Sequence, residues 1–155
     1  RFNKKIKLIH ISSDGVYPSN KGNYSEKSSL EPYNIYGWTK LASEFIVKLV
    51  DKHVIVRTRF FDKKLLTFKK SANDIFTSSL EVNDLVKKIK IISSKKFYGV
   101  INVGSKRHSD FTEYKKYIPN LKVCKHKDII KGLNVNLAKD SSMNLNLFNK
   151  IKNNK

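Results

Sequence analysis

Two short stretches carry residues that could do proton chemistry at a carbonyl. Tyr36 and Lys40 lie four residues apart, so on a helix both side chains leave the same face, one turn apart. A lysine ammonium beside the phenol favours its ionised form, which makes Tyr36 a candidate proton donor or acceptor for a carbonyl/alcohol pair. Ser13 lies upstream, in Ile11-Ser12-Ser13-Asp14, and its hydroxyl could hold the same oxygen.

The spacing of Tyr36 and Lys40 is a weak signal by itself. The chain has 7 Tyr and 28 Lys in 155 residues, so chance yields about one such pair. A second pair does exist, Tyr17 and Lys21, but Pro18 follows at once and predicts a turn rather than a helix. The secondary structure predicted around each pair must therefore decide which pair is a candidate site.

The first stretch follows a predicted strand. Residues 6–11 are a short apolar run, typical of a central parallel strand that is covered on both faces. The run ends at Ser12-Ser13-Asp14-Gly15, at the carboxyl end of the strand, where ligands bind in open α/β sheets. Residues 16–33 are rich in Pro, Ser, Asn, Gly and charge, and predict a long surface loop.

The second stretch opens a predicted helix. Asn34 is a good N-cap, and the helix is expected to run to about residue 51. Residues 53–58 form the next predicted strand, which completes a strand–helix–strand unit. Apolar residues spaced by three and four form one stripe along the helix: Trp38, Leu41, Ala42, Phe45, Ile46, Leu49 and Val50.

The rest of the chain is less regular. Residues 59–75 show no clear period. Four elements are predicted beyond them: an amphipathic helix over 82–92 that starts near Asn83-Asp84, a strand over 99–104, a short helix over 109–118 and a last helical turn or two over 145–151.

The formal net charge of +19 raises the question of nucleic-acid binding. Of the 32 basic residues, 28 are Lys and 4 are Arg, whereas specific recognition of bases and phosphates depends on Arg forks. The lysines are also spread along the whole chain. We interpret them as a solvated surface and do not expect nucleic acid to be the main partner.

Cysteine usage and hydropathy indicate which cellular compartment to expect. The single cysteine, Cys124, excludes an internal disulfide framework and fits a reducing compartment. No run of 18 apolar residues and no signal-peptide pattern is present, so we expect a cytoplasmic protein without a membrane span. Cys124 and His126 lack a partner pair to complete a zinc set, so no metal site is predicted.

With these elements placed, the chain resembles the dTDP-4-dehydrorhamnose reductase family of extended short-chain dehydrogenases/reductases. The segment HISSDGVYPSNKGNYSEKSSLEPYNIYGWTKLASE resembles that family's strand, S-T-D-x-V-F loop and P-x-N-x-Y-G-x-(S/T)-K-L-x-G-E motif. VIVRTRFF resembles its R-T-S-W-V-Y strand end, DIFTSSLEVNDLVKKI its P-T-x-x-x-D-L-A segment, and GVINVGSKRHSDFTEY its G-x-Y-H-V-x-G segment. The resemblance covers most of residues 6–118.

The resemblance implies a role for five residues. Ser13, Tyr36 and Lys40 take the catalytic positions, with Tyr36 as acid/base and Lys40 as the residue that tunes it and holds the nicotinamide ribose. Asp14 matches an aspartate that helps to hold the sugar, and Phe60 stands roughly where the family has a substrate-contacting Trp. The implied reaction is reduction of the C4 ketone of a nucleotide-linked deoxysugar by NADPH or NADH.

The implied fold is the C-terminal half of a Rossmann-like doubly wound parallel sheet, with a small substrate-binding α/β portion. We expect residues 1–58 to belong to the catalytic core, and residues 59–155 to supply the remaining core elements and the substrate-binding portion. None of the six glycines forms the dinucleotide fingerprint, so we expect the glycine-rich N-terminal half to be absent and this piece alone to be inactive. The strand over 6–11 should then expose an apolar edge.

Two other functions stay open. One is an NAD-dependent nucleotide-sugar epimerase or dehydratase of the same superfamily, although dehydratases usually carry an acidic pair where this chain has Asp14-Gly15. The other is a non-catalytic binding module, as in the regulatory subunit of methionine adenosyltransferase, which resembles the same family. The expected partners are a nucleotide-diphosphate sugar and, as a candidate, a second copy of the chain in a homodimer.

Overall fold

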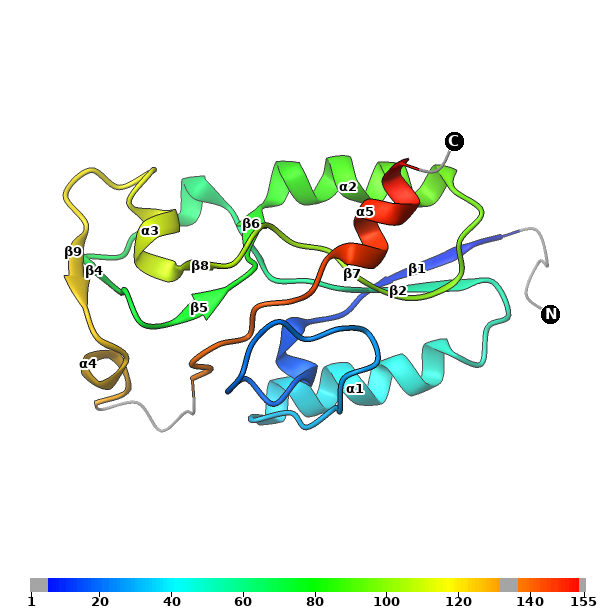
Figure 1. The fold of residues 1–155 in the computed structure, drawn as a ribbon, viewed down its shortest axis with the longest axis horizontal. Helices are drawn as coiled ribbons and strands as arrows, with labels where there is room; N and C mark the ends of the chain where they lie inside the picture. The colour runs from blue at the N-terminus through cyan, green and yellow to red at the C-terminus, as the bar shows by residue number, and fades with distance from the viewer. Residues whose placement is uncertain (1–5, 132–136, 154–155) are drawn as a thin grey trace.

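A three-stranded parallel sheet organises the computed structural model, which describes residues 6–131 and 137–153. The strands are β1 (Leu8–Ile11), β2 (His53–Arg57) and β7 (Gly99–Asn102), in the order β1-β2-β7. Helix α1 (Ile35–Val47) lies on one side of the sheet, and α2 (Val82–Ser94) and α5 (Asn146–Asn153) lie on the other (Figure 1). The parallel α/β architecture expected from the sequence is confirmed.

The central strand explains the continuous apolar run of the sequence. Val54, Ile55 and Val56 of β2 are fully buried, because β1 and β7 flank the strand and helices cover both faces. The main core lies between the sheet and the pair α2/α5, and Ile92 and Phe148 pack into it from those helices.

Short strand pairs form the other end of the molecule, beyond the carboxyl ends of the sheet (Figure 1). Two pairs are parallel: β3 (Phe60–Phe61) with β6 (Leu80–Glu81), and β4 (Lys70–Ala72) with β9 (Lys122–Cys124). A third is antiparallel, β5 (Phe76–Thr77) with β8 (His108–Ser109). Short helices complete this end: η2 (Lys63–Leu65), α3 (Asp110–Tyr114) and α4 (His126–Ile130). A further short helix, η1 (Asp14–Val16), follows β1 and packs against α1.

The predicted elements exist, with shorter bounds in most cases. Residues 59–75 show no period because strands of two or three residues cannot display one; β3, η2 and β4 all lie there. The sequence also did not indicate β9 or α4. The division of the chain at residue 58 stays a prediction.

The surface-loop prediction for residues 16–33 is wrong in part. Val16 and Tyr17 are fully buried and Tyr24 nearly so, in a second core with Leu41 of α1 and Met143 of the C-terminal segment. The rings of Tyr17 and Tyr24 stack with centroids 5.0 Å apart. Two tyrosines in an otherwise polar segment form no hydrophobic period, so the sequence did not indicate that they are buried. They nevertheless hold the loop against α1.

Most of the apolar stripe predicted on α1 faces solvent, and Leu41 is its one buried member. Gly37, Leu41 and Glu44 are the buried residues of this helix, and its last helical residue is Val47. Glu44 is turned inward because it pairs with Arg57 of β2, and this buried ion pair, rather than the apolar stripe, sets the rotation of the helix. Most of the large apolar side chains of α1 are consequently exposed.

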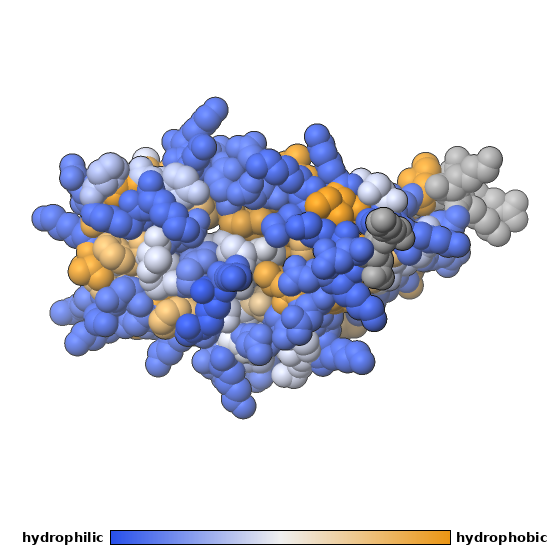
Figure 2. Space-filling model, turned by 45° about the horizontal axis from the view of Figure 1, so that its top comes forward, coloured by the Kyte–Doolittle hydropathy of each residue, from blue (hydrophilic) through white to orange (hydrophobic). Residues whose placement is uncertain are grey.

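The surface carries the charge of the chain. Figure 2 shows that hydrophilic residues dominate this face of the molecule, with separate apolar patches between them. At the sheet edge, Ile6 and Leu8 are exposed, and the pairing of β1 within the described residues is with β2. None of the helices described is long and apolar enough to cross a membrane.

Candidate functional site

A cavity of about 680 Å³ lies at the carboxyl ends of β1 and β2. Four of the five predicted site residues line it: Ser13, Asp14, Tyr36 and Phe60. Lys40 is not among the lining residues. Both stretches that the sequence analysis selected therefore contribute residues to one cavity. The strand pairs at the far end of the molecule form its other wall.

Ser13 is held at the end of β1 by a helix cap. It is the N-cap of η1, and its Oγ accepts a hydrogen bond from the Gly15 amide at 3.0 Å. The Ser13 hydroxyl also donates to Asp14 Oδ1 at 3.2 Å. The residue is buried, so the turn fixes the orientation of its side chain.

Tyr36 is placed by the first turn of α1. Asn34 caps the helix as predicted, since its Oδ1 accepts from the Gly37 amide at 2.8 Å. A Cβ at Gly37 would lie 2.2 Å from the Gly15 carbonyl oxygen, so no larger residue fits there without a shift of backbone. This close approach brings the helix start against the Ser13 turn.

Ser13 and Tyr36 meet at Gly15. A Cβ built on Gly15 would lie 3.3 Å from Ser13 Oγ and 4.0 Å from Tyr36 Cδ1. The Ser13 hydroxyl and the Tyr36 ring therefore approach each other across Gly15, and both residues line the cavity.

Lys40 lies one turn after Tyr36, as the spacing predicts, but its ammonium is engaged elsewhere. Nζ donates to the Ile11 carbonyl at 2.6 Å and ties α1 to the end of β1. An ammonium has three donors, so two remain for a ribose hydroxyl or for Tyr36. The residues present therefore fit the nicotinamide–ribose end of a dinucleotide. The described glycines are scattered over η1, α1, β7 and loops and do not form a phosphate-binding fingerprint.

A cluster of three charges forms part of the cavity wall. The Arg59 guanidinium lies 3.4 Å from Asp110 Oδ2, and the charge of Asp14 acts on it as well. Burial raises the pKa of Asp14 and of Asp110, and Arg59 opposes the rise at both. Asp110 Oδ1 and the hydroxyl oxygen of Thr58 are buried without a hydrogen-bond partner among the described residues.

Asp14 also contacts a segment that is distant in sequence. Ser141 Oγ donates to Asp14 Oδ2 at 2.6 Å, while Ser13 occupies the other carboxylate oxygen. Asp14 therefore fixes the C-terminal segment against the strand end. Its predicted contact with a sugar stays a prediction.

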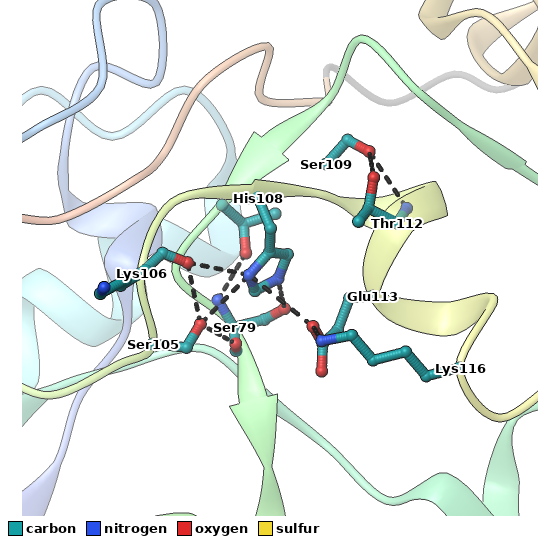
Figure 3. A network of polar contacts seen from close by, with 9 residues as sticks. Ser79, Ser105, Lys106, His108, Ser109, Thr112, Glu113 and Lys116 are labelled. Atoms are coloured by element: carbon teal, nitrogen blue, oxygen red, sulfur yellow. Dashed lines mark hydrogen bonds and ion pairs between the residues drawn. The ribbon is translucent and has the colours of Figure 1, made fainter.

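Figure 3 shows the contacts that fix the start of α3, the helix that supplies Asp110. His108 Nε2 lies 3.1 Å from Ser79 Oγ, and Nδ1 lies 3.2 Å from Ser105 Oγ and 3.9 Å from Glu113 Oε2. Ser109 then caps the helix through the Thr112 amide. This cluster holds the first residue of α3 at the cavity.

A buried polar network lies behind the cavity and joins the carboxyl ends of all three strands. Arg57 donates to both carboxylate oxygens of Glu44, at 3.0 and 2.6 Å, and to the Tyr17 hydroxyl at 3.0 Å. The Tyr17 hydroxyl donates to Asn102 Oδ1 at 2.8 Å, and Ser12 Oγ donates to Glu44 at 2.5 Å. Tyr17 thus braces the loop and does not face the cavity.

The sequence did not indicate much of the cavity wall. It comes from segments without a period, which reach the site through pairings distant in sequence. The position of Arg59 directly after the strand predicted over 53–58 was the one signal available for this residue. Besides the lining residues already named, six others carry an aromatic ring or a charge: Tyr33, Phe68, Lys70, Tyr114, Asp128 and Lys131.

Comparison with known proteins identifies the relatives of the chain. Residues 2–95 match the family described as RmlD substrate binding domain. A hypothetical dTDP-4-dehydrorhamnose reductase from Sulfolobus tokodaii superposes with a TM-score of 0.78 at 26% identity, over 94% of this chain and 58% of that one. The dTDP-4-dehydrorhamnose reductase of Bacillus anthracis, solved in complex with NADP, gives 0.77 at 26% identity, over 93% and 59%.

More distant structures share the fold alone. The UDP-glucuronic acid 4-epimerase of Bacillus cereus, solved with NAD, superposes with a TM-score of 0.67 at 19% identity, over 95% of this chain and 56% of that one. No curated protein sequence gives a significant match. The chain spans less than three fifths of the length of each of these solved relatives. Since the family match covers more than half of the chain and the fold agrees with it, the chain belongs to the RmlD substrate binding domain family.

Proposed function

We propose that this chain is the proton-transfer and substrate-binding portion of an NAD(P)-dependent reductase that acts on a nucleotide-activated 4-keto-6-deoxysugar. The observation that carries the proposal is the meeting of the Ser13 hydroxyl and the Tyr36 ring at Gly15, in the wall of a cavity at the ends of parallel strands. The family and the relatives solved with NADP and NAD support a nicotinamide cofactor.

Tyr36 is the acid in this proposal. Its phenol gives a proton to the C4 oxygen of the sugar as negative charge develops there, and Lys40 stabilises the phenolate that remains. The Ser13 hydroxyl turns from Asp14 to the same oxygen, a change made easy by the long 3.2 Å bond that it leaves. When bound, NADPH or NADH supplies the hydride to C4.

The remaining cavity wall suits a nucleotide sugar. Phe60, Phe68 and Tyr114 offer aromatic faces for the sugar and the base, and the ammonium groups of Lys70 and Lys131 suit a diphosphate. The volume of about 680 Å³ lies within the range of small-molecule sites, roughly 300–1,000 Å³. Substrate binding is therefore assigned to the chain itself.

The test has two arms. Calorimetry measures the binding of a dTDP-linked 4-keto-6-deoxysugar to the 155-residue chain, and absorbance follows NAD(P)H oxidation in a polypeptide that joins this chain to a dinucleotide-binding half. Tyr36→Phe should leave binding within about twofold and lower the rate by about 10²–10⁴-fold, the usual contribution of general acid–base catalysis. An unchanged rate in this variant would show that Tyr36 is not the acid.

The same preparations separate the alternatives. An epimerase retains NAD through purification and shows no net consumption of the cofactor. A non-catalytic module binds the sugar nucleotide or another ligand without turnover, in the wild type and in Tyr36→Phe alike.

A further inference from the structure

Two buried polar atoms in the cavity wall have no hydrogen-bond partner among the described residues, namely the hydroxyl oxygen of Thr58 and Oδ1 of Asp110. Both residues line the cavity, and both are more than nine-tenths buried, at 2% and 8% exposed. Buried polar atoms of folded proteins are nearly always hydrogen-bonded, because an unpaired atom has lost its hydration without compensation. Since these two atoms belong to residues that line a cavity, a ligand bound there is the natural source of the missing partner.

The fold leaves Oδ1 of Asp110 as the oxygen that a ligand can use. Asp110 is the first residue of α3, and its amide donates to the Ile75 carbonyl at 3.0 Å. The other carboxylate oxygen, Oδ2, lies 3.4 Å from the Arg59 guanidinium. Because the backbone is fixed and Oδ2 is directed at Arg59, turning Oδ1 toward a second protein group would break this ion pair.

Arg59 gives this part of the wall a charge that the family motif lacks. In the comparison of VIVRTRFF with R-T-S-W-V-Y, Arg59 stands where the motif has Ser. Its side chain is 32% exposed and lines the cavity, so Asp110 does not enclose it and a ligand can reach it. A guanidinium has five N–H donors in one plane, whereas a carboxylate offers acceptors alone. Arg59 and Asp110 therefore present a donor next to an acceptor.

The pair lies beside the residues that are proposed to act on the sugar. Arg59 is near enough to Asp14 for its charge to oppose the rise in the pKa of that carboxyl, and Asp14 directly follows Ser13. In the proposed function, Ser13 and Tyr36 contact the C4 oxygen. A group that binds to Arg59 and Asp110 is therefore expected on the hexose ring, at carbons near C4, rather than on the nucleotide.

We propose that Arg59 and Asp110 determine which hexose the site accepts, by binding a neighbouring donor and acceptor of the sugar ring; the inference rests on the proposed function. Asp110 Oδ1 accepts a hydrogen bond from an O–H or N–H of the sugar, and Arg59 donates to the oxygen beside it. Two kinds of ring substituent have this chemistry: a pair of vicinal hydroxyls at C2 and C3, and an acetamido group at C2. A hexose without either leaves Oδ1 unpaired in the complex and should bind more weakly.

Calorimetry on the 155-residue chain tests the selectivity of the wild type. The ligands compared are dTDP, a dTDP-linked 4-keto-6-deoxyhexose with hydroxyls at C2 and C3, its 2-acetamido counterpart and its 2,3-dideoxy counterpart. Because a hydrogen bond to a charged group is lost with the dideoxy sugar, the hydroxylated or the acetamido sugar should bind at least about tenfold more tightly. Whichever of these two binds more tightly identifies the substituent.

Two variants test whether the selectivity comes from this pair. In Asp110→Asn the amide oxygen should stay on Arg59, which places the amide nitrogen, a donor, where the sugar needs an acceptor. The preference over the dideoxy sugar should then fall to within about twofold, and the affinity for dTDP should stay within about twofold of the wild type. Asp84→Asn is the matched control, because Asp84 also lies in the first turn of a helix but is not among the residues that line the cavity. It should keep the full preference.

The outcomes separate this inference from the proposed function. A preference that is lost in Asp110→Asn and kept in Asp84→Asn supports it, and if Asp110→Asn fails to fold, the selectivity of the wild type decides alone. Equal affinity of the wild type for all three sugars, or an equal loss of affinity for every ligand in Asp110→Asn, overturns the inference and leaves the proposed function in place. A wild type that binds none of the sugar nucleotides refutes the proposed function and this inference with it.

Discussion

Removal of the Glu44 carboxylate is expected to be among the most destabilising single changes in this chain. Glu44 is fully buried and accepts three hydrogen bonds, one from Ser12 and two from Arg57. Burial opposes the charge of Arg57, but the hydrogen bonds and charge of Glu44, with Tyr17, outweigh it and raise the pKa of Arg57. Glu44→Leu therefore leaves a charged guanidinium in the interior without its counter-ion.

The expected cost follows from that unpaired charge. Removing one partner of a buried ion pair costs about 3–5 kcal/mol, against a total stability of roughly 5–15 kcal/mol for a single domain. At about 2–4 °C per kcal/mol for a chain of this size, Glu44→Leu should lower Tm by roughly 6–20 °C. Urea unfolding followed by circular dichroism, at one protein concentration for all variants, measures the change.

A double-mutant cycle tests the reason for the cost. Arg57→Met should destabilise the chain by a similar amount, because it leaves the Glu44 carboxylate unpaired. Glu44→Leu/Arg57→Met should cost at least about 2 kcal/mol less than the sum of the two single changes, since no buried charge remains. If the two single effects simply add, the pair does not act as a buried unit and the reasoning is wrong.

Three further predictions follow from the site and its surroundings. Gly37→Ala should cost roughly 1–3 kcal/mol, measured by urea unfolding, because its Cβ would lie 2.2 Å from the Gly15 carbonyl oxygen. Burial raises the folded-state pKa of Asp14 and of Asp110. The stability of the wild type should therefore fall as the pH rises from the ordinary value of 3.8 through these raised pKa values. In thermal melts between about pH 4 and about pH 7, the double variant Asp14→Asn/Asp110→Asn should show a smaller change of Tm with pH. Lys87→Met, which removes an exposed ion pair on α2, should leave Tm unchanged within error, and a large loss would show that this exposed pair stabilises the helix more than solvent screening allows.

The sequence predicted those parts of the structure that local pattern specifies. Residues close together in the sequence were enough to predict the parallel strands and the Asn34 cap, and the structure has both. They were also enough to select Ser13, Tyr36 and Lys40 as candidate site residues. The orientation of α1 could not be predicted from hydropathy, because a charged residue, Glu44, is its innermost side chain and its partner Arg57 is thirteen residues away.

The cavity wall could be predicted least. Arg59 and Asp110 are 51 residues apart, and about 50 residues separate β4 from its partner β9. Short strands of two or three residues carry no alternation that could indicate their partners. The pairing of such segments depends on contacts between residues distant in sequence, and composition and spacing do not predict those contacts.

The hydrogen bond between Ser141 and Asp14 has a consequence for the synthesis of the protein. It joins residues 127 positions apart, and the neighbouring bonds from the Tyr24 amide to Ser142 and from the Asn144 amide to Tyr24 close similar loops. During translation, residues 141–144 are made long after β1 and its Ser13 turn, because more than a hundred residues separate them. The nascent chain therefore carries an unfinished site until these residues have left the ribosome, and a chain that ends before Ser141 would lack the contacts that close this part of the fold.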